Sequence, residues 1–286
     1  MSKFKLYHAV LFAAIGCVGL TACSDDKDEP TPNPDVTTEA NAKNVFTQGI
    51  PTQVGDMTIV ANNKGQVTEI KEDGEVIAKF NYDGTNSRAT RPTDYDMTMT
   101  TEDGDVFYIK LNKDGFIEYA FEEENNDEPS SDEWWFKYND NGQMVEMKRT
   151  EGDNEVTTIK YNADGDIVEV RVKDDVDGEK HVTTVAYTDA THATPIINKS
   201  GMMLYDDSFR IDMDEMAPAY FAGLLGKGTT HLPLSAIEKT TQIDYSDTSN
   251  YTFQWFLNPS DMPVKFISTM TYDGGYTDTD EVEFKW

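Results

Sequence analysis

Acidic turns are the first residues to consider, because carboxylates grouped around a glycine can bind calcium. A calcium-binding loop places acidic or amide ligands at its first, third and fifth positions, ahead of a glycine at the sixth. Counting back from Gly142, Gly165 and Gly178 puts a lysine in the first position each time. A lysine at that position opposes cation binding, so we predict hairpin turns here and no metal site.

Catalytic groups are difficult to single out in this chain. The histidines beyond residue 23 are His181, His192 and His231, and no two have a spacing that places both rings on one face. Residues 223–229 resemble a phosphate-binding loop but lack its first glycine and the hydroxyl residue after the lysine, so we interpret them as a helix terminus. We predict no catalytic residue and no cofactor. A glycan hydrolase with two suitably spaced carboxylates stays open as a less favoured alternative.

Aromatic side chains are more informative candidates, because flat rings stack on sugar rings and on apolar ligands. Aromatic residues at alternate positions of a strand more often fill a protein core, and this second interpretation stands beside the first. The candidate ligand-binding residues are Trp134, Trp135, Tyr138, Tyr220, Phe221 and Trp255.

A repeated hairpin positions several of these candidates. One copy runs from Phe136 through a tyrosine to Gly142, and the other runs from Ile159 through a tyrosine to Gly165, each with Asn-x-x-Gly at the turn. Asn and Gly tolerate the positive φ angles that tight hairpin turns require. We predict an antiparallel pair of strands around each copy. Strict alternation of side chains would place Val168 and Val170 on one face of the return strand and Ile167 on the other.

Similar turns occur throughout residues 56–178, where Asn-x-x-Gly alternates with a second kind that is mostly Asp-Gly. The intervals have the length of strands, and consecutive hairpins form antiparallel neighbours, so we predict an up-and-down meander of about ten strands. Four more strands are expected near residues 240–245, 251–257, 264–272 and 276–286. An all-β sheet of this width must curl, split or close into a barrel.

Residues 201–228 are the least strand-like part of the chain. Asp212 or Asp214 can cap a helix that continues to Leu225, and glycines follow to end it. An apolar stripe along this helix has one plausible partner, the apolar face of the sheet. We therefore predict one short helix that covers the sheet or plugs one mouth of a barrel. The stripe consists of Met216, Tyr220 and Leu224.

The N-terminus has the features of a secretion signal. Lysines precede an apolar run that is too short to span a bilayer, and Cys23 follows a small residue, as in the lipobox of bacterial lipoproteins. We expect residues 1–22 to be a signal peptide, Cys23 to carry the lipid, residues 23–43 to be an acidic, proline-rich tether, and residues 44–286 to form one β domain. The acidic cluster after Cys23 either resembles a signal for export to the outer face of the outer membrane or is a plain linker.

The net charge of −29 excludes several partners. Nucleic acid binding requires a basic groove, and the chain has no cluster of Lys and Arg. Strands that span a membrane need about nine to eleven residues with an uncharged outer band, whereas the expected strands are shorter and rich in Asp and Glu. We therefore expect contact with the membrane through the N-terminal lipid only.

Several segments together resemble a family of putative lipoproteins of the Bacteroides group. They are the lipobox at Cys23, the repeated Tyr-Asn-x-x-Gly hairpins, and the segments 201–216, 220–227 and 232–234. The family is a domain of unknown function with a porin-like fold. The resemblance implies a curled or closed antiparallel sheet, and it implies no activity.

The sequence thus leaves two main hypotheses and no named activity. The first is a lipid-anchored protein of the outer membrane, facing either the periplasm or the cell surface, that is not an enzyme and binds a glycan, a peptide or a small apolar molecule beside residues 201–228. The second is a structural or assembly role, in which an edge strand or an acidic face docks onto another envelope protein.

Overall fold

The computed structural model describes residues 39–82, 95–125, 131–150, 154–173, 180–242, 246–272 and 275–286. The expected signal peptide, Cys23 and residues 24–38 of the expected tether lie outside these ranges. So do three of the expected turns, at residues 83–84, 151–152 and 177–178.

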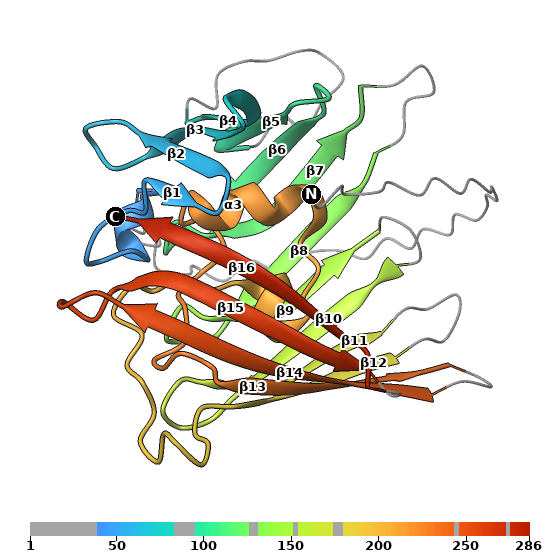
Figure 1. Cartoon of the computed structure of the whole chain (residues 1–286). Coiled ribbons are helices and arrows are strands. Elements are labelled where there is room, and N and C mark those ends of the chain that lie inside the picture. The colour runs from blue at the N-terminus through green and yellow to red at the C-terminus, as the bar shows by residue number, and fades with distance from the viewer. Residues whose placement is uncertain are drawn as a thin grey trace, which may run out of the picture. The chain divides into compact units, whose positions relative to one another are not determined.

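The strands form one closed antiparallel barrel, in which each strand pairs with its neighbours in the chain and β1 pairs with β16 (Figure 1). The ten strands expected within residues 56–178 are β2 to β11, and the four later ones are β13 to β16, so the predicted meander is confirmed. β13 begins at Ser235 rather than near residue 240. The strands are β1 Gln53–Val54, β2 Met57–Ala61, β3 Val67–Glu72, β4 Glu75–Asn81, β5 Met97–Thr101, β6 Val106–Leu111, β7 Ile117–Glu123, β8 Glu133–Tyr138, β9 Met144–Arg149, β10 Val156–Tyr161, β11 Ile167–Lys173, β12 Lys180–Ala186, β13 Ser235–Thr241, β14 Ser246–Leu257, β15 Pro263–Tyr272 and β16 Thr277–Lys285.

The Asn-x-x-Gly turns are built as expected. In the turn after β8, the side-chain oxygen of Asn139 accepts hydrogen bonds from the backbone N–H groups of Asn141 and Gln143, both at 3.0 Å. Gly142 has a φ of 77°, which an L side chain rarely adopts. The same pair of bonds forms at Asn62, Asn112 and Asn162.

A fifth turn of this kind joins β14 to β15, and the sequence pattern missed it. Asn258 accepts from Ser260 and Met262 in the same way, but Asp261, with a φ of 61°, occupies the place of the glycine. Asp tolerates the left-handed conformation better than most residues. The five turns lie at one end of the barrel, which we call the Asn-turn end, because an even number of strands separates them.

The strict alternation predicted for β11 is wrong at its start. Ile167 is fully buried and Val168 is 36% exposed, so Ile167 shares the inner face with Val170. The cause is a β-bulge: Tyr161 faces Ile167 and the preceding residue of β10 faces Glu169, so Val168 has no partner. A register shift at the same place follows each of the other Asn turns, and it explains why apolar residues recur three apart after each turn.

Residues 200–234 are mostly buried inside the barrel, so we call this segment the plug. It contains α2 Tyr205–Phe209, the 3-10 helix η2 Asp214–Met216 and α3 Ala217–Phe221, the last visible among the strands in Figure 1. Its apolar side chains belong to the same buried cluster as the inward residues of the strands. The predicted plugging of the barrel is therefore confirmed.

The single helix predicted from Asp212 or Asp214 to Leu225 is wrong in its extent. Asp214 adopts a φ of 44°, which interrupts the helical backbone, and Pro218 stands at the start of α3, where its missing N–H costs no hydrogen bond. At the other end, Gly223 and Leu224 donate to the carbonyls of Tyr220 and residue 219, a Schellman motif that ends the helix. The interpretation of residues 223–229 as a helix terminus is thus confirmed.

The folded domain begins earlier than the expected boundary at residue 44. Ala40 and Ala42 are buried, and the 3-10 helix η1 Ala42–Asn44 is tied to the Asn-turn end through the Ala42 N–H and the Gly65 carbonyl, at 3.1 Å. The Phe46 ring lies 5.8 Å from the Tyr220 ring of the plug. The tether therefore ends before residue 43, because the side chains of Ala40 and Ala42 enter the core. In the described residues, no helix has the length and apolar character to cross a membrane.

Candidate functional site

Three of the six candidate aromatic residues lie inside the barrel. Trp134 is fully buried, and Tyr220 and Phe221 are 2% and 7% exposed. Trp134 faces inward from β8. The other two lie on α3, where the Tyr220 ring packs against Phe46, Tyr205 and Phe221. The expectation that these three rings face a ligand is wrong in this structure, because they fill the interior as the core interpretation proposed.

Two further candidates join the barrel wall to neighbouring segments. The Tyr138 hydroxyl donates to the Ile117 carbonyl at 2.7 Å, and its ring lies 5.3 Å from Phe116. The Trp255 indole N–H donates to the Pro233 carbonyl at 2.8 Å, at the end of the plug. Both polar tips are already bonded within the protein, which indicates structural roles for these side chains.

Trp135 differs from the other candidates because it points away from the barrel. Its ring lies 5.8 Å from Tyr119 at an interplanar angle of 51°, and the Lys148 ammonium lies 5.2 Å above it. The three residues are direct cross-strand neighbours on β7, β8 and β9. We call them the outer platform. Burial, and then the adjacent Glu133 carboxylate, raises the pKa of Tyr119.

The sequence pointed to one of these three residues only. Tyr119 and Lys148 are adjacent to Trp135 through strand pairing, and the register of that pairing follows from the bulges beside the turns. A strand alignment that included the bulge after each Asn turn would have found both.

The mouth-facing side of the plug is acidic, and two arginines connect it to the wall. Arg149, the last residue of β9, lies 3.1 Å from Asp214, 3.5 Å from Glu155 and 3.6 Å from Asp212. Its guanidinium also lies 5.6 Å from the centre of the Trp134 ring. We call this group the Arg149 cluster; it holds η2 against β8, β9 and the start of β10.

The second connection is centred on Arg210, which follows α2. Its guanidinium lies 3.3 Å from Asp206 and 3.5 Å from Glu238, above the Tyr251 ring at 5.2 Å. Burial disfavours a charged Glu238, but hydrogen bonds from His181 and Tyr251 outweigh it and lower the pKa of this carboxyl. Glu238 is thus a fixed anion on β13 that anchors the plug.

The chain matches the family model "Domain of unknown function (DUF4595) with porin-like fold" over residues 53–265. It belongs to this family. The match runs from β1 into β15 and so contains the plug, the outer platform and both arginine clusters. Among curated proteins, the chain has no match.

Two solved structures have the same fold as this family member. A porin-like protein from Bacteroides uniformis ATCC 8492 is 17% identical with a TM-score of 0.58, covering 80% of this chain and 88% of its own. A porin-like protein from Bacteroides vulgatus ATCC 8482 is 14% identical with a TM-score of 0.54, covering 83% of this chain and 99% of its own. Both similarities concern the fold.

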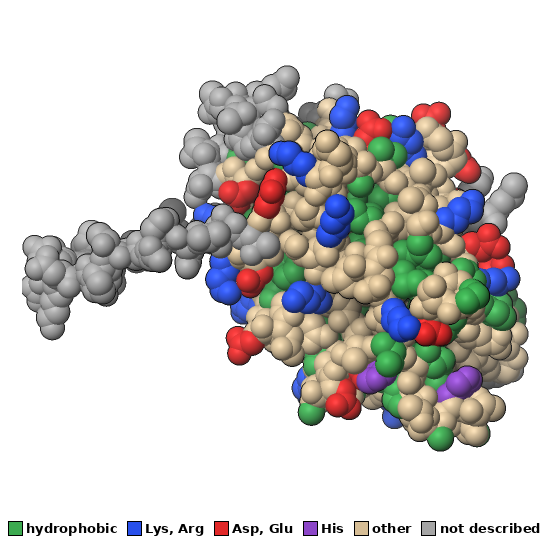
Figure 2. Space-filling view, turned by 90° about the vertical axis from the view of Figure 1, so that its left-hand side faces the viewer, with side chains coloured by type: hydrophobic (Ala, Val, Ile, Leu, Met, Phe, Trp, Pro, Cys, Tyr) green, Lys and Arg blue, Asp and Glu red, His purple; other side chains and the backbone are tan. Residues whose placement is uncertain are grey.

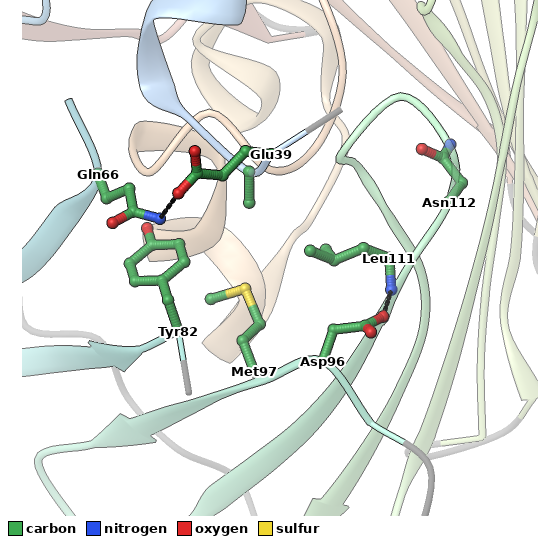
Figure 3. A pocket seen from close by; sticks show the side chains of 8 residues that line it. Glu39, Gln66, Tyr82, Asp96, Met97, Leu111 and Asn112 are labelled. Atoms are coloured by element: carbon green, nitrogen blue, oxygen red, sulfur yellow. Dashed lines mark hydrogen bonds between the residues drawn. The ribbon is translucent and has the colours of Figure 1, made fainter. Parts of the chain in front are cut away.

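The hollows at the Asn-turn end of this porin-like domain are small. One, of about 220 Å³, lies between Tyr82, Met97 and Leu111, where Gln66 bonds Glu39 across its rim (Figure 3). Another of about 220 Å³ lies beside the plug. Ordinary ligand pockets measure about 300–1,000 Å³. None of the candidate aromatic residues lines either hollow.

Among the described residues, the surface of the Asn-turn end carries no patch in which all the charged side chains have the same sign. On its described surface, basic and acidic side chains are interspersed with small groups of hydrophobic side chains (Figure 2). In the described part of the chain, no group of three or more His, Cys, Asp or Glu side chains is arranged to hold a metal ion.

Three carboxyls of the plug, those of Asp206, Asp207 and Glu215, have raised pKa values. Burial raises the pKa of Glu215 to about 7, and the neighbouring Asp214 carboxylate contributes to the shift. Burial raises the pKa of Asp207 to about 6, with Asp206 contributing.

These shifts predict a dependence of stability on pH. A carboxyl with a higher pKa in the folded protein than in the unfolded chain lowers stability as pH rises through that interval, here from about 4 to 7 for Glu215. Glutamine mimics the protonated form. We expect Glu215→Gln to melt within about 1 °C of wild type at pH 5 and at least about 2 °C above it at pH 8, by calorimetry.

Asp207→Asn provides a parallel test, because its interval ends near pH 6. Its melting temperature relative to wild type is expected to rise with pH and to level off earlier than that of Glu215→Gln. A constant difference from pH 5 to pH 8 for both variants would show that neither carboxyl takes up a proton on folding.

Proposed function

We propose that this chain is a lipid-anchored protein of the outer membrane whose plugged barrel stands in water at the cell surface and binds a glycan on the outer platform. The proposal makes it a binding module and not an enzyme or a pore. The observation that carries it is the outward-facing Tyr119–Trp135–Lys148 row, whose two rings are partly exposed, on a barrel whose other candidate rings are buried or bonded internally.

The plug supports a role other than conduction. Its apolar side chains fill the interior, and its backbone bonds the Asn-turn end, where the Lys227 N–H donates to the Gly142 carbonyl at 2.8 Å. The Gln143 side chain also donates to the Gly228 carbonyl at 3.1 Å. A filled interior of this kind leaves surface binding as the available role.

The outer wall supports a barrel that faces water. Ion pairs connect outward residues of neighbouring strands, as between Lys137 and Glu146 at 2.6 Å and between Lys160 and Glu169 at 2.6 Å. A lysine or arginine on the lipid face of a membrane barrel costs about 2–4 kcal/mol at the bilayer midplane. Cys23, in the lipobox-like segment, would then be the attachment to the membrane.

The outer platform has the parts that sugar recognition uses. Two adjacent, partly exposed rings offer apolar faces to the C–H groups of a pyranose, and the Lys148 ammonium and Glu133 carboxylate beside them can bond its hydroxyls. A small apolar molecule would leave those charged groups without a role. A peptide is the remaining alternative among the ligands we considered.

Binding of the purified protein to an array of host and dietary glycans tests the proposal. For a glycan that binds, we expect Trp135→Ala to weaken affinity by about tenfold or more, since a central aromatic contact is worth over 1 kcal/mol. Trp135→Phe is expected to retain most of the affinity, because it keeps a flat ring.

Phe256→Ala is the matched control for this experiment. Phe256 is 46% exposed on β14 with Lys265 5.9 Å from its ring, so it offers the same type of surface away from the platform. Its removal should leave glycan affinity unchanged. Equal losses in Trp135→Ala and Phe256→Ala, or binding that survives both, would refute the assignment of the platform as the site.

A second candidate function is assembly with another envelope protein. The observation that favours it is the part of β16 at residues 277–282, beside which the described residues place a strand on one side only. It is independent of the outer platform.

A further inference from the structure

β16 pairs with β15 along most of its length on one side, and with the short strand β1 only near its end on the other side. It forms seven residue pairs with β15, from Lys265↔Glu283 to Thr271↔Thr277. It forms two pairs with β1, through Phe284 and Lys285. Figure 1 shows β16 continuing well beyond the end of β1. In the described residues, no strand lies beside residues 277–282 on that side; we call this stretch the free edge.

The backbone of the free edge is oriented for pairing. The carbonyls of Glu283 and Lys285 accept hydrogen bonds from residues 55 and 52 on the β1 side. Because backbone groups alternate along a strand, the N–H and C=O groups of Thr277, Thr279 and Glu281 point to the same side. The Thr279 N–H bonds the side chain of its own neighbour, Asp278, at 2.9 Å, as expected for a donor without a partner strand.

The side chains of the free edge define what could pair there. Asp278 and Asp280 share the face of inward residues on β15, while Glu281 and Glu283 share the outward face, so acids lie on both faces. Residues 277–281 are all exposed. Acidic edges repel one another, and this prevents two copies of the chain from pairing edge to edge. A basic strand would bring the opposite charge to both faces.

We infer that the free edge of β16 accepts an extended, lysine- or arginine-rich segment of another protein as an added antiparallel strand. Main-chain hydrogen bonds from Thr277, Thr279 and Glu281 supply the affinity, and the acids on the two faces select a basic partner. The interaction does not depend on the glycan site, which lies on β7 to β9.

A peptide of alternating lysine and threonine, eight residues long, is the probe. We expect it to bind the purified full chain by calorimetry, more weakly at higher salt, and to protect the amides of Thr277, Thr279 and Glu281 from hydrogen exchange. The same lysine–threonine peptide with a methyl group on every backbone nitrogen has the same charge but no main-chain donor. It is expected to bind at least about tenfold more weakly.

Thr279→Pro tests the same site from the protein side. Proline removes the N–H that faces the free side and leaves the backbone bonds to β15, because Thr269 and Thr279 form a pair whose backbone groups point away from each other. Proline and valine both remove the 3.3 Å hydroxyl contact with Thr269, so the valine variant controls for that loss. We expect at least a tenfold loss of peptide binding in Thr279→Pro and less than a twofold change in Thr279→Val, which keeps the N–H. Melting curves show whether the proline variant folds; the exchange measurement on wild type needs no variant.

Three results would overturn the inference. They are equal affinity for the unmodified and the N-methylated peptides, unchanged exchange at Thr277, Thr279 and Glu281 in the presence of bound peptide, and peptide affinity in folded Thr279→Pro equal to that of wild type. Each would mean that a basic peptide associates with the acidic surface without adding a strand.

Discussion

Replacement of Tyr220 by alanine is expected to lower the free energy of unfolding by about 4 kcal/mol, near the upper part of the range for large buried side chains. Tyr220 is 2% exposed at the centre of the plug, where its ring contacts Phe46, Tyr205 and Phe221 at centroid distances of 5.0 to 5.8 Å. Its hydroxyl donates to the Gly201 carbonyl at 2.7 Å. The substitution removes one ring that connects the N-terminal segment, α2 and α3.

Two matched variants separate the contribution of the Tyr220 ring from that of its hydrogen bond and from the effect of removing any tyrosine. The free energy of unfolding of each is measured by urea denaturation. Tyr220→Phe keeps the ring and loses only the hydrogen bond, so we expect a loss of about 1 kcal/mol. Tyr276, which is 68% exposed, serves as the surface control, and Tyr276→Ala should change stability by less than about 0.5 kcal/mol. A loss under 1 kcal/mol for Tyr220→Ala would contradict a plug that is part of the folded core.

Gly223→Ala is expected to cost at least about 2 kcal/mol, for two reasons that add. Gly223 has a φ of 74° in the Schellman motif after α3, and a left-handed backbone costs an L residue roughly 1–2 kcal/mol. An added Cβ would also meet the Ala42 Cα at 2.5 Å, far inside contact distance. Backbone atoms on one side or the other would have to move.

Gly74→Ala measures the cost of the left-handed backbone alone, without a steric clash. Gly74 has a φ of 90° in the β3–β4 turn, and a Cβ there would meet nothing within 4 Å. We expect it to cost about 1 kcal/mol, less than Gly223→Ala, in the same denaturation experiment. Equal costs for the two variants would mean that η1 does not press against the end of α3.

Local signals predicted most of the barrel correctly. Asn139 and Gly142 determine their turn through bonds and angles within a few residues, so a repeated turn motif was sufficient to predict a meander. What the pattern did not contain was the extra residue after each turn, at Val168 for example. A bulge changes which side chains face inward, and it arises from the pairing of two strands rather than from either strand alone.

The helical segment and the candidate site were predicted less well, for a related reason. The stripe of Met216 and Tyr220 indicated a helix against the sheet, but the backbone breaks at Asp214 because Arg149 and Asp212 bind the residues there. The alternation of side chains along β8 placed Trp134 and Trp135 on opposite faces of the strand, but it did not determine which face is inside the barrel. That choice depends on the closure of the barrel and on the plug, which are properties of the whole chain.

The outer platform and the free edge of β16 lie on the outside of a barrel whose interior its own chain occupies. The raised pKa values of Asp207 and Glu215 belong to the contact between plug and wall, so they affect stability rather than surface binding. The remaining part of the proposed function is membrane attachment through Cys23. If this lipid is the membrane anchor, the outer wall of the barrel faces water and not lipid.

The most direct measurement is the partitioning of the full chain and of Cys23→Ser between membranes and buffer, with palmitate labelling of both. We expect the wild-type protein to incorporate label and to sediment with membranes. Cys23→Ser should be unlabelled and remain folded in buffer without detergent, because ion pairs such as Lys137–Glu146 cover the wall. A Cys23→Ser protein that stays in carbonate-washed membranes as a folded barrel would contradict a wall that faces water.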